Sequence, residues 1–209
     1  MSAVSETIVR EFFEALGYQV CQPCKHLVGG RAKRPDEEAD LLIRHPAIAE
    51  LRIPEHVLWT ADDLQTISQA VVCIYGWHAE RIYPAMLENL PEIVRFAAPE
   101  ALRAARMKLG SDQAATILCL PNLPASADLK DRLLSRLREK GVNGVLCFRA
   151  ILQTLIKQVD AAKNYDKSDV LQMIRIMKIY DLLQSSQLEL FARRKASRRR
   201  KGVPDLGSA

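Results

Sequence analysis

Hydrophobic residues along the chain follow two spacings, one typical of amphipathic helices and one typical of buried strands. Apolar residues three or four positions apart predict helices in the segments 6–16, 127–140 and 151–159. Short apolar runs predict strands in the segments 70–77, 115–120 and 144–148. The run at 70–77, AVVCIYGW, is apolar at consecutive positions, which is typical of a central strand covered on both faces.

Weaker patterns supply the remaining elements. Strands are expected at 18–21, 39–44 and 57–60, the last of them short and at an edge. Pro84 and Pro91 break the helical stretch 79–97, and Pro99 suits the first turn of a helix that ends at Gly110. Because strands alternate with helices, we predict an α/β fold, with a central mixed sheet flanked by helices in one three-layer domain over residues 1–183.

The last predicted helix, residues 169–183, has an unusual pattern. Polar residues fall at every third position (Gln172, Arg175, Lys178 and Asp181), and most of the rest are apolar. Such a helix must be largely buried, either in the domain's own core or against a partner. Residues 184–209 are polar and then basic, so we expect them to form a mobile tail.

The charge of the chain is concentrated in that tail. Residues 192–209 contain one acidic residue, Asp205, and seven basic residues: Arg193, Arg194, Lys195, Arg198, Arg199, Arg200 and Lys201. Subtracting them from the totals of 30 basic and 25 acidic residues leaves 23 and 24 in residues 1–191, a net charge of −1. Such a cationic arm typically contacts nucleic acid or another acidic surface, although it can also act only as a solubilising tail.

Composition narrows the class of protein. No apolar run is long enough to span a bilayer and no signal peptide begins the chain, so we expect a cytoplasmic protein that does not contact membranes. Three of the five cysteines lie in apolar runs, as buried thiols do in a reducing compartment. Cys21 and Cys24 with His26 resemble half of a zinc site, but no second pair of ligands follows, so we predict no metal site.

Common catalytic motifs are missing from the sequence. It has no Gly-rich nucleotide-binding loop, no Walker A motif and no HExxH or GxSxG pattern, which excludes the common nucleotide-binding folds. One group of features remains: an acid in the first turn of the first helix, the pair Gly17-Tyr18, the tripeptide Glu38-Ala39-Asp40, and the apolar strand that ends in Gly76-Trp77. Together these features resemble the PD-(D/E)XK nuclease superfamily, the fold of many restriction enzymes, junction resolvases and repair nucleases.

The resemblance covers about residues 5–183 and implies a restriction-endonuclease-like domain with a remnant catalytic site. Glu6, eleven residues before Gly17, matches the helical glutamate, and Asp40 matches the aspartate that opens the second strand. The E-x-K motif of the third strand falls on Cys73 and Tyr75. In the family the acids bind Mg²⁺ and the lysine orients a water, so Cys73 and Tyr75 replace two of the three core catalytic residues. Strand alternation predicts that both face the same side of the sheet as Asp40.

These observations leave three functions open. We expect a catalytically degenerate nuclease-fold protein, without a cofactor, that binds nucleic acid, DNA in particular, without sequence specificity or serves as a subunit of a nucleic-acid-processing or defence complex. One alternative is an active Mg²⁺-dependent endonuclease whose catalytic groups have moved, with carboxylates from Glu80, Asp62 or Asp63 and a cation from Lys25 or Arg81. The other is a subunit that only binds proteins, through helix 169–183.

Overall fold

The computed structural model describes residues 3–23, 34–76, 78 and 81–183. The chain divides into two compact units, Met1–Gln158 and Val159–Ala209. The predicted boundary between the domain and the tail, at residues 183 and 184, coincides with the end of the described residues and stays a prediction. The seven basic residues of the tail lie outside the described residues.

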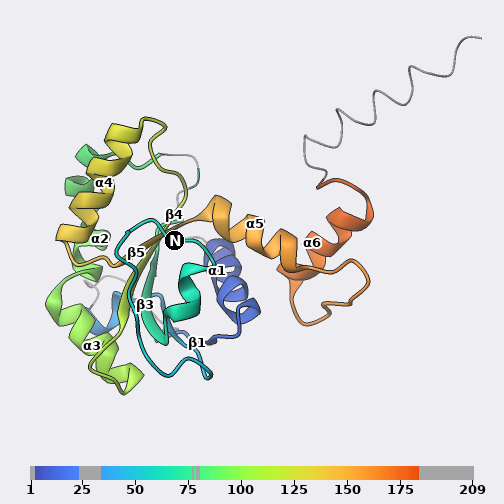
Figure 1. Cartoon of the computed structure of the whole chain (residues 1–209), viewed down its shortest axis with the longest axis horizontal. Helices are drawn as coiled ribbons and strands as arrows, with labels where there is room; N and C mark the ends of the chain where they lie inside the picture. Colours follow the sequence, from blue (N-terminus) through green and yellow to red (C-terminus); the bar gives the residue numbers. More distant parts are fainter. Residues whose placement is uncertain (1–2, 24–33, 77, 79–80, 184–209) are drawn as a thin grey trace, which may run out of the picture. The chain divides into compact units, whose positions relative to one another are not determined.

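The larger unit is built on a five-stranded mixed sheet (Figure 1). Its strands are β1 (Gln19–Cys21), β2 (Leu41–Arg44), β3 (Gln69–Ile74), β4 (Ala115–Leu120) and β5 (Gly144–Cys147). They lie in the order β1-β2-β3-β4-β5. The pairs β1–β2 and β2–β3 are antiparallel, and the pairs β3–β4 and β4–β5 are parallel. The predicted α/β class with a central mixed sheet is therefore confirmed, and β3 is the central strand.

Helices cover both faces of the sheet, as predicted (Figure 1). The α-helices in the described part of the larger unit are α1 (Ala3–Ala15), α2 (Pro91–Phe96), α3 (Pro99–Leu109), α4 (Ala127–Glu139) and α5 (Phe148–Gln158). Helices α1 and α5 contact each other on one side of the sheet, while α2, α3 and α4 lie on the other side. Pro84 begins a 3₁₀ helix, Pro84–Asn89, and Pro91 begins α2, so the two prolines divide the predicted helical stretch as expected.

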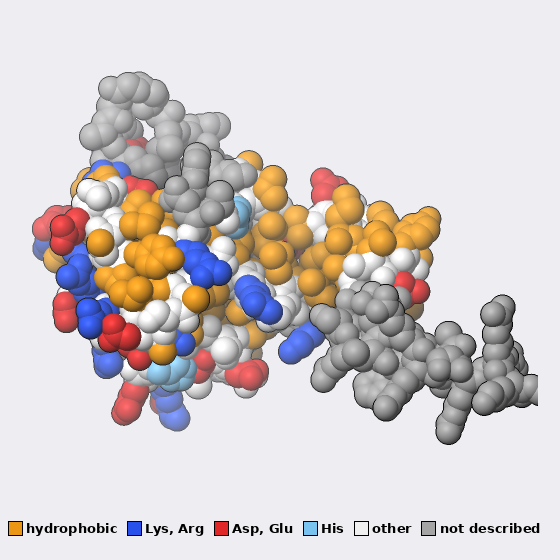
Figure 2. All heavy atoms as spheres, turned by 90° about the horizontal axis from the view of Figure 1, so that it is seen from above, with side chains coloured by type: hydrophobic (Ala, Val, Ile, Leu, Met, Phe, Trp, Pro, Cys, Tyr) orange, Lys and Arg blue, Asp and Glu red, His pale blue; other side chains and the backbone are white. Residues whose placement is uncertain are grey.

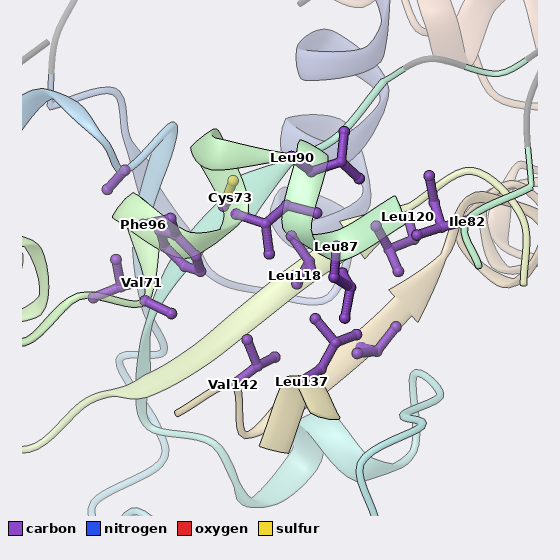
Figure 3. Packing of buried hydrophobic residues seen from close by; sticks show 14 of the residues in the cluster. Val71, Cys73, Ile82, Leu87, Leu90, Phe96, Leu118, Leu120, Leu137 and Val142 are labelled. Carbon is purple, nitrogen blue, oxygen red and sulfur yellow. The ribbon is translucent and has the colours of Figure 1, made fainter. Parts of the chain in front are cut away.

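Strands β3 and β4 are buried along almost their whole length, which explains their apolar sequences. Alternate side chains of β3 point to opposite faces, so Val71 and Cys73 share one face. They pack in a cluster with Leu118 of β4, Phe96 of α2 and Leu137 of α4 (Figure 3). This cluster joins the sheet to the layer formed by α2, α3 and α4.

Two predicted features of the larger unit differ from the structure. The first helix is predicted to begin at residue 6, but α1 already begins at Ala3, and Ser5 is buried inside it. The predicted strand 57–60 is reduced to a single parallel bridge between Leu58 and Val145, at the outer edge of β5. The edge position is as predicted, but the segment is too irregular to form a ladder.

The smaller unit contains one described helix, α6 (Asp169–Ile179). The Ser168 side chain caps its first turn by accepting a hydrogen bond from the amide of Leu171 at 3.2 Å. Ile174 is the buried residue of α6, whereas several of its other apolar side chains are exposed. The core of this unit therefore does not bury α6 extensively, and the alternative that a partner covers the helix stays a prediction. None of the helices in the described ranges is long and apolar enough to cross a membrane.

Candidate functional site

Asp40 lies directly before β2, beside the end of the central strand β3. The register pairs Leu41 with Val72, and continuing it by one residue sets Asp40 opposite Cys73. The Asp40 amide donates to the Val72 carbonyl at 2.9 Å. The Asp40 Oδ2 atom accepts a hydrogen bond from the amide of Ile74 at 2.7 Å. The Asp40 carboxylate therefore contacts the backbone between Cys73 and Tyr75, and the expectation that the three side chains share one face of the sheet stays a prediction.

The hydrogen bond from Ile74 gives the Asp40 carboxylate a structural task. The next backbone amide, that of Tyr75 directly after β3, donates to the Cys119 carbonyl on the β4 side at 2.9 Å. The Ile74 amide points to the opposite side, toward the start of β2. There the Asp40 carboxylate accepts its hydrogen bond in place of a backbone carbonyl. A buried amide left without an acceptor costs free energy, so Asp40 stabilises this end of the sheet.

We expect Asp40→Ala to lower the free energy of unfolding by about 2 kcal/mol, because it removes a hydrogen bond to a charged acceptor. Asp40→Asn keeps an acceptor oxygen and is expected to cost less than about 1 kcal/mol. Urea unfolding of both variants measures the difference, with Asp112→Ala, at an exposed turn position, as the control. If Asp40→Ala is as stable as the wild type, the carboxylate does not stabilise the end of β3.

Cys73 has the surroundings of a core residue. Its side chain is 5% exposed and lies in the hydrophobic cluster with Leu90, Phe96 and Leu118 (Figure 3). Tyr75, two residues further along the strand, is half-buried and packs against the same cluster. An ionised carboxylate at position 73 would lose its hydration in such surroundings, whereas a thiol packs there at little cost.

Glu6 and Tyr18 connect α1 to the antiparallel side of the sheet. The Glu6 carboxylate is half-buried and accepts a hydrogen bond from the side-chain amide of Gln22, which follows β1. Tyr18 is buried, and its hydroxyl lies 2.6 Å from the Leu64 carbonyl and 2.8 Å from that of Ile67. Burial raises the pKa of Tyr18 well above its usual range. The glycine-aromatic pair of the sequence thus ends α1 and fixes β1 to the loop before β3.

The structure places Asp62 and Asp63, the described candidates for relocated catalytic carboxylates, away from Asp40. Asp62 lines a cavity of about 660 Å³ together with His45, which follows the far end of β2 from Asp40. Burial favours a higher pKa for Asp63, but hydrogen bonds from Thr60 and the neighbouring His56 outweigh it, so the pKa lies below its usual value. Neither residue therefore joins Asp40. Arg81 is exposed, and Glu80, Lys25, Cys24 and His26 lie outside the described residues.

Two cysteines at the ends of β4 and β5 and a lysine on α4 were not identified as site residues from the sequence. Burial raises the pKa of the Cys119 thiol far above its usual value, and the charges of Asp40 and Cys147 raise it further. Burial also raises the pKa of Cys147 to about 11, although the positive charge of Lys130 on α4 acts in the opposite direction. Both thiols therefore stay protonated at neutral pH, where they are poor nucleophiles. Lys130 brings a cation to the end of β5.

A serine and a histidine also meet at the start of α1. The Ser5 hydroxyl lies 2.9 Å from His78 Nε2, and the His78 ring packs edge-on against Phe148 at 4.4 Å. Ser5 is only 1% exposed, so its hydroxyl is closed to a substrate and instead connects α1 to the segment after β3. No local motif marks this pair, because its members are distant in the sequence.

Metal ligands do not gather at this site. Over the part of the chain that the structure describes, no three His, Cys, Asp or Glu side chains lie close enough together to hold a metal ion. Comparison with protein-family models, curated proteins and solved structures finds no match to this chain. The interpretation of the site therefore depends on the geometry around Asp40 and on the resemblance in the sequence.

Proposed function

We propose that this chain is a catalytically degenerate nuclease-fold protein that binds nucleic acid, DNA in particular, without cutting it. The observation that carries the proposal is the hydrogen bond from the Ile74 amide to Asp40, at 2.7 Å. It supports the alignment of Asp40 with the aspartate of PD-(D/E)XK nucleases and of Cys73 and Tyr75 with the glutamate and lysine. The antiparallel strands β1, β2 and β3 after a first helix support it as well.

Loss of cutting follows from the residue types at the aligned positions. Mg²⁺ prefers oxygen ligands, and the thiol of Cys73 does not supply one. A phenol such as that of Tyr75 carries no positive charge, so it cannot replace a lysine ammonium that polarises a water. Asp40 would remain as one carboxylate without a second hard ligand at position 73.

Affinity for nucleic acid is assigned to the basic arm, residues 193–201. The preceding 191 residues carry a net charge of −1, and basic and acidic side chains are interspersed on the face of the larger unit in Figure 2. Binding would come from contacts with phosphates and the release of counterions, which are independent of sequence. Cys73 and Cys119 are buried in the hydrophobic core, as cysteines of reducing compartments commonly are, which supports a site of action such as the cytoplasm.

The test is an assay for binding and cutting by the full-length chain. We expect it to shift short DNA duplexes of unrelated sequence equally and to leave supercoiled plasmid intact with Mg²⁺ or Mn²⁺. Asp40→Asn is the matched variant, because it retains the acceptor for the Ile74 amide. Metal-dependent cutting by the wild type that Asp40→Asn lacks would establish an active endonuclease, and cutting by both proteins would indicate a contaminating nuclease.

A second candidate function is a subunit that binds other proteins through residues 169–183. It is favoured by the exposure of apolar side chains on α6, such as Ile179 at 49% and Tyr180 at 72%. Pull-downs with and without nuclease treatment separate the two functions. Partners that depend on bound nucleic acid disappear after the treatment, whereas a protein that contacts α6 directly stays bound.

A further inference from the structure

Helix α6 carries an apolar face that is exposed in the structure. The α6 face consists of Met173, Ile176, Ile179 and Tyr180, whose side chains are 58%, 39%, 49% and 72% exposed. With 3.6 residues per turn, these four positions lie on one side of the helix, opposite the buried Ile174. Hydrophobic side chains are also visible on the surface of the smaller unit in Figure 2.

The basic residues of α6 turn away from this face. Arg175 Nε donates to the Ala161 carbonyl at 3.1 Å, and Lys178 Nζ donates to the Val159 carbonyl. Both side chains thereby bind the loop that precedes the helix within the same unit. The α6 face is left with apolar groups and no lysine or arginine, so it suits an apolar partner and not the phosphates of nucleic acid.

The two ends of the α6 side are complementary to each other. Asp169 is exposed at the N-terminal end of α6, and Tyr180 is exposed at the C-terminal end of the helix. If two α6 helices pair antiparallel about a two-fold axis, Met173 of each lies opposite Ile176 of the other. The same axis sets Asp169 opposite Tyr180 of the second copy, whose hydroxyl can donate to the carboxylate. A parallel pair would instead set the two Asp169 carboxylates side by side.

We propose that a second copy of this chain binds the α6 face, with the two helices antiparallel. The contact is isologous, because each helix supplies the same residues, and the two helix dipoles oppose each other favourably. An 11-residue helix is about 16 Å long, so the buried area falls short of the roughly 1,600 Å² of a standard interface. The dimer is therefore weak, with a dissociation constant of about 10 μM to 1 mM.

Sedimentation of the full-length chain over about 10 μM to 1 mM measures the association. The salt concentration should be about 0.5 M, because this screens repulsion between the two basic arms. Ile176→Glu at the middle of the α6 face is expected to raise the dissociation constant at least tenfold. The matched control is Met107→Glu, an exposed apolar position on α3 that is 83% exposed, and it should leave association unchanged. A chain that stays monomeric, or one whose association resists Ile176→Glu, overturns the proposal.

The orientation is tested by disulfide cross-linking in a chain without Cys21 and Cys24. Antiparallel pairing predicts that chains with Met173→Cys form more cross-linked dimer when mixed with chains carrying Ile176→Cys than either variant forms alone. Parallel pairing would cross-link each variant with itself and would overturn the proposed geometry. Circular dichroism shows that the variants are folded, so a loss of cross-linking cannot come from unfolding.

Discussion

Removing residues 192–209 is expected to weaken binding to duplex DNA by at least about 100-fold at 0.1 M salt. The reason is that about six to ten contacts with phosphates together contribute orders of magnitude to the affinity at such salt concentrations. The deletion removes seven basic residues and leaves a net charge of −1. The slope of log K against log salt should also fall, from about −6 for seven neutralised phosphates toward zero. Fluorescence anisotropy with a labelled duplex at several salt concentrations measures both quantities.

Two variants of full length distinguish charge from sequence in the arm. A tail in which the seven basic residues are replaced by glutamine should behave like the deletion. A tail with the same residues in shuffled order should bind like the wild type, because contacts with phosphates carry no sequence information. Equal affinity of the wild type and the glutamine variant would contradict the assignment of binding to the arm.

Gly144→Ala is expected to lower the free energy of unfolding by about 3 kcal/mol, at the upper end of the cost of overpacking a core. A Cβ atom at Gly144 would lie 2.2 Å from two carbon atoms of the Trp59 ring. The ring cannot move away easily, since Trp59 is 1% exposed and its Nε1 donates to the His56 carbonyl at 2.8 Å. The backbone is held as well, by a hydrogen bond from the Trp59 amide to Val145 at 2.9 Å.

The control is Gly110→Ala, which introduces the same atom into open space. Gly110 has φ of 67° and nothing within 4 Å of the added Cβ, so only the left-handed backbone opposes alanine, at a cost of about 1 kcal/mol. Denaturant unfolding compares the two variants. In a double-mutant cycle with Trp59→Leu, the clash at Gly144 should be partly relieved. Equal costs for Gly144→Ala and Gly110→Ala would show that the ring of Trp59 yields to the added atom.

The elements built from continuous local patterns could be predicted from the sequence. The apolar runs around Val72 and Leu118 became the central strand β3 and its neighbour β4, because both are covered by helices on two faces. Pro84 and Pro91 begin new helical elements because proline is tolerated in a first turn and not further inside a helix. The strand predicted at 39–44 became β2, and Asp40 lies directly before it.

Contacts between distant segments could not be predicted in the same way. Ser5 looks like a helix cap in the sequence, and its contact with His78, 73 residues away, becomes visible only in the fold. Lys130 resembles the other basic residues of α4 until the fold places it near Cys147. For α6, the pattern predicts burial on most sides, and only the fold shows that Arg175 donates to the Ala161 carbonyl while Ile176 is exposed.

The short segment beside β5 has a consequence for how the protein behaves at high concentration. The Val145 amide of β5 donates to the Val57 carbonyl at 2.6 Å, and the Val145 carbonyl accepts from the Trp59 amide. Residues 57–59 therefore occupy hydrogen-bonding groups that β5 would otherwise present as an edge strand. Open edges invite strands from other molecules and lead to aggregation. At the other end of the sheet, β1 is only three residues long and offers little to pair with. Concentrated solutions should therefore resist the growth of intermolecular sheets.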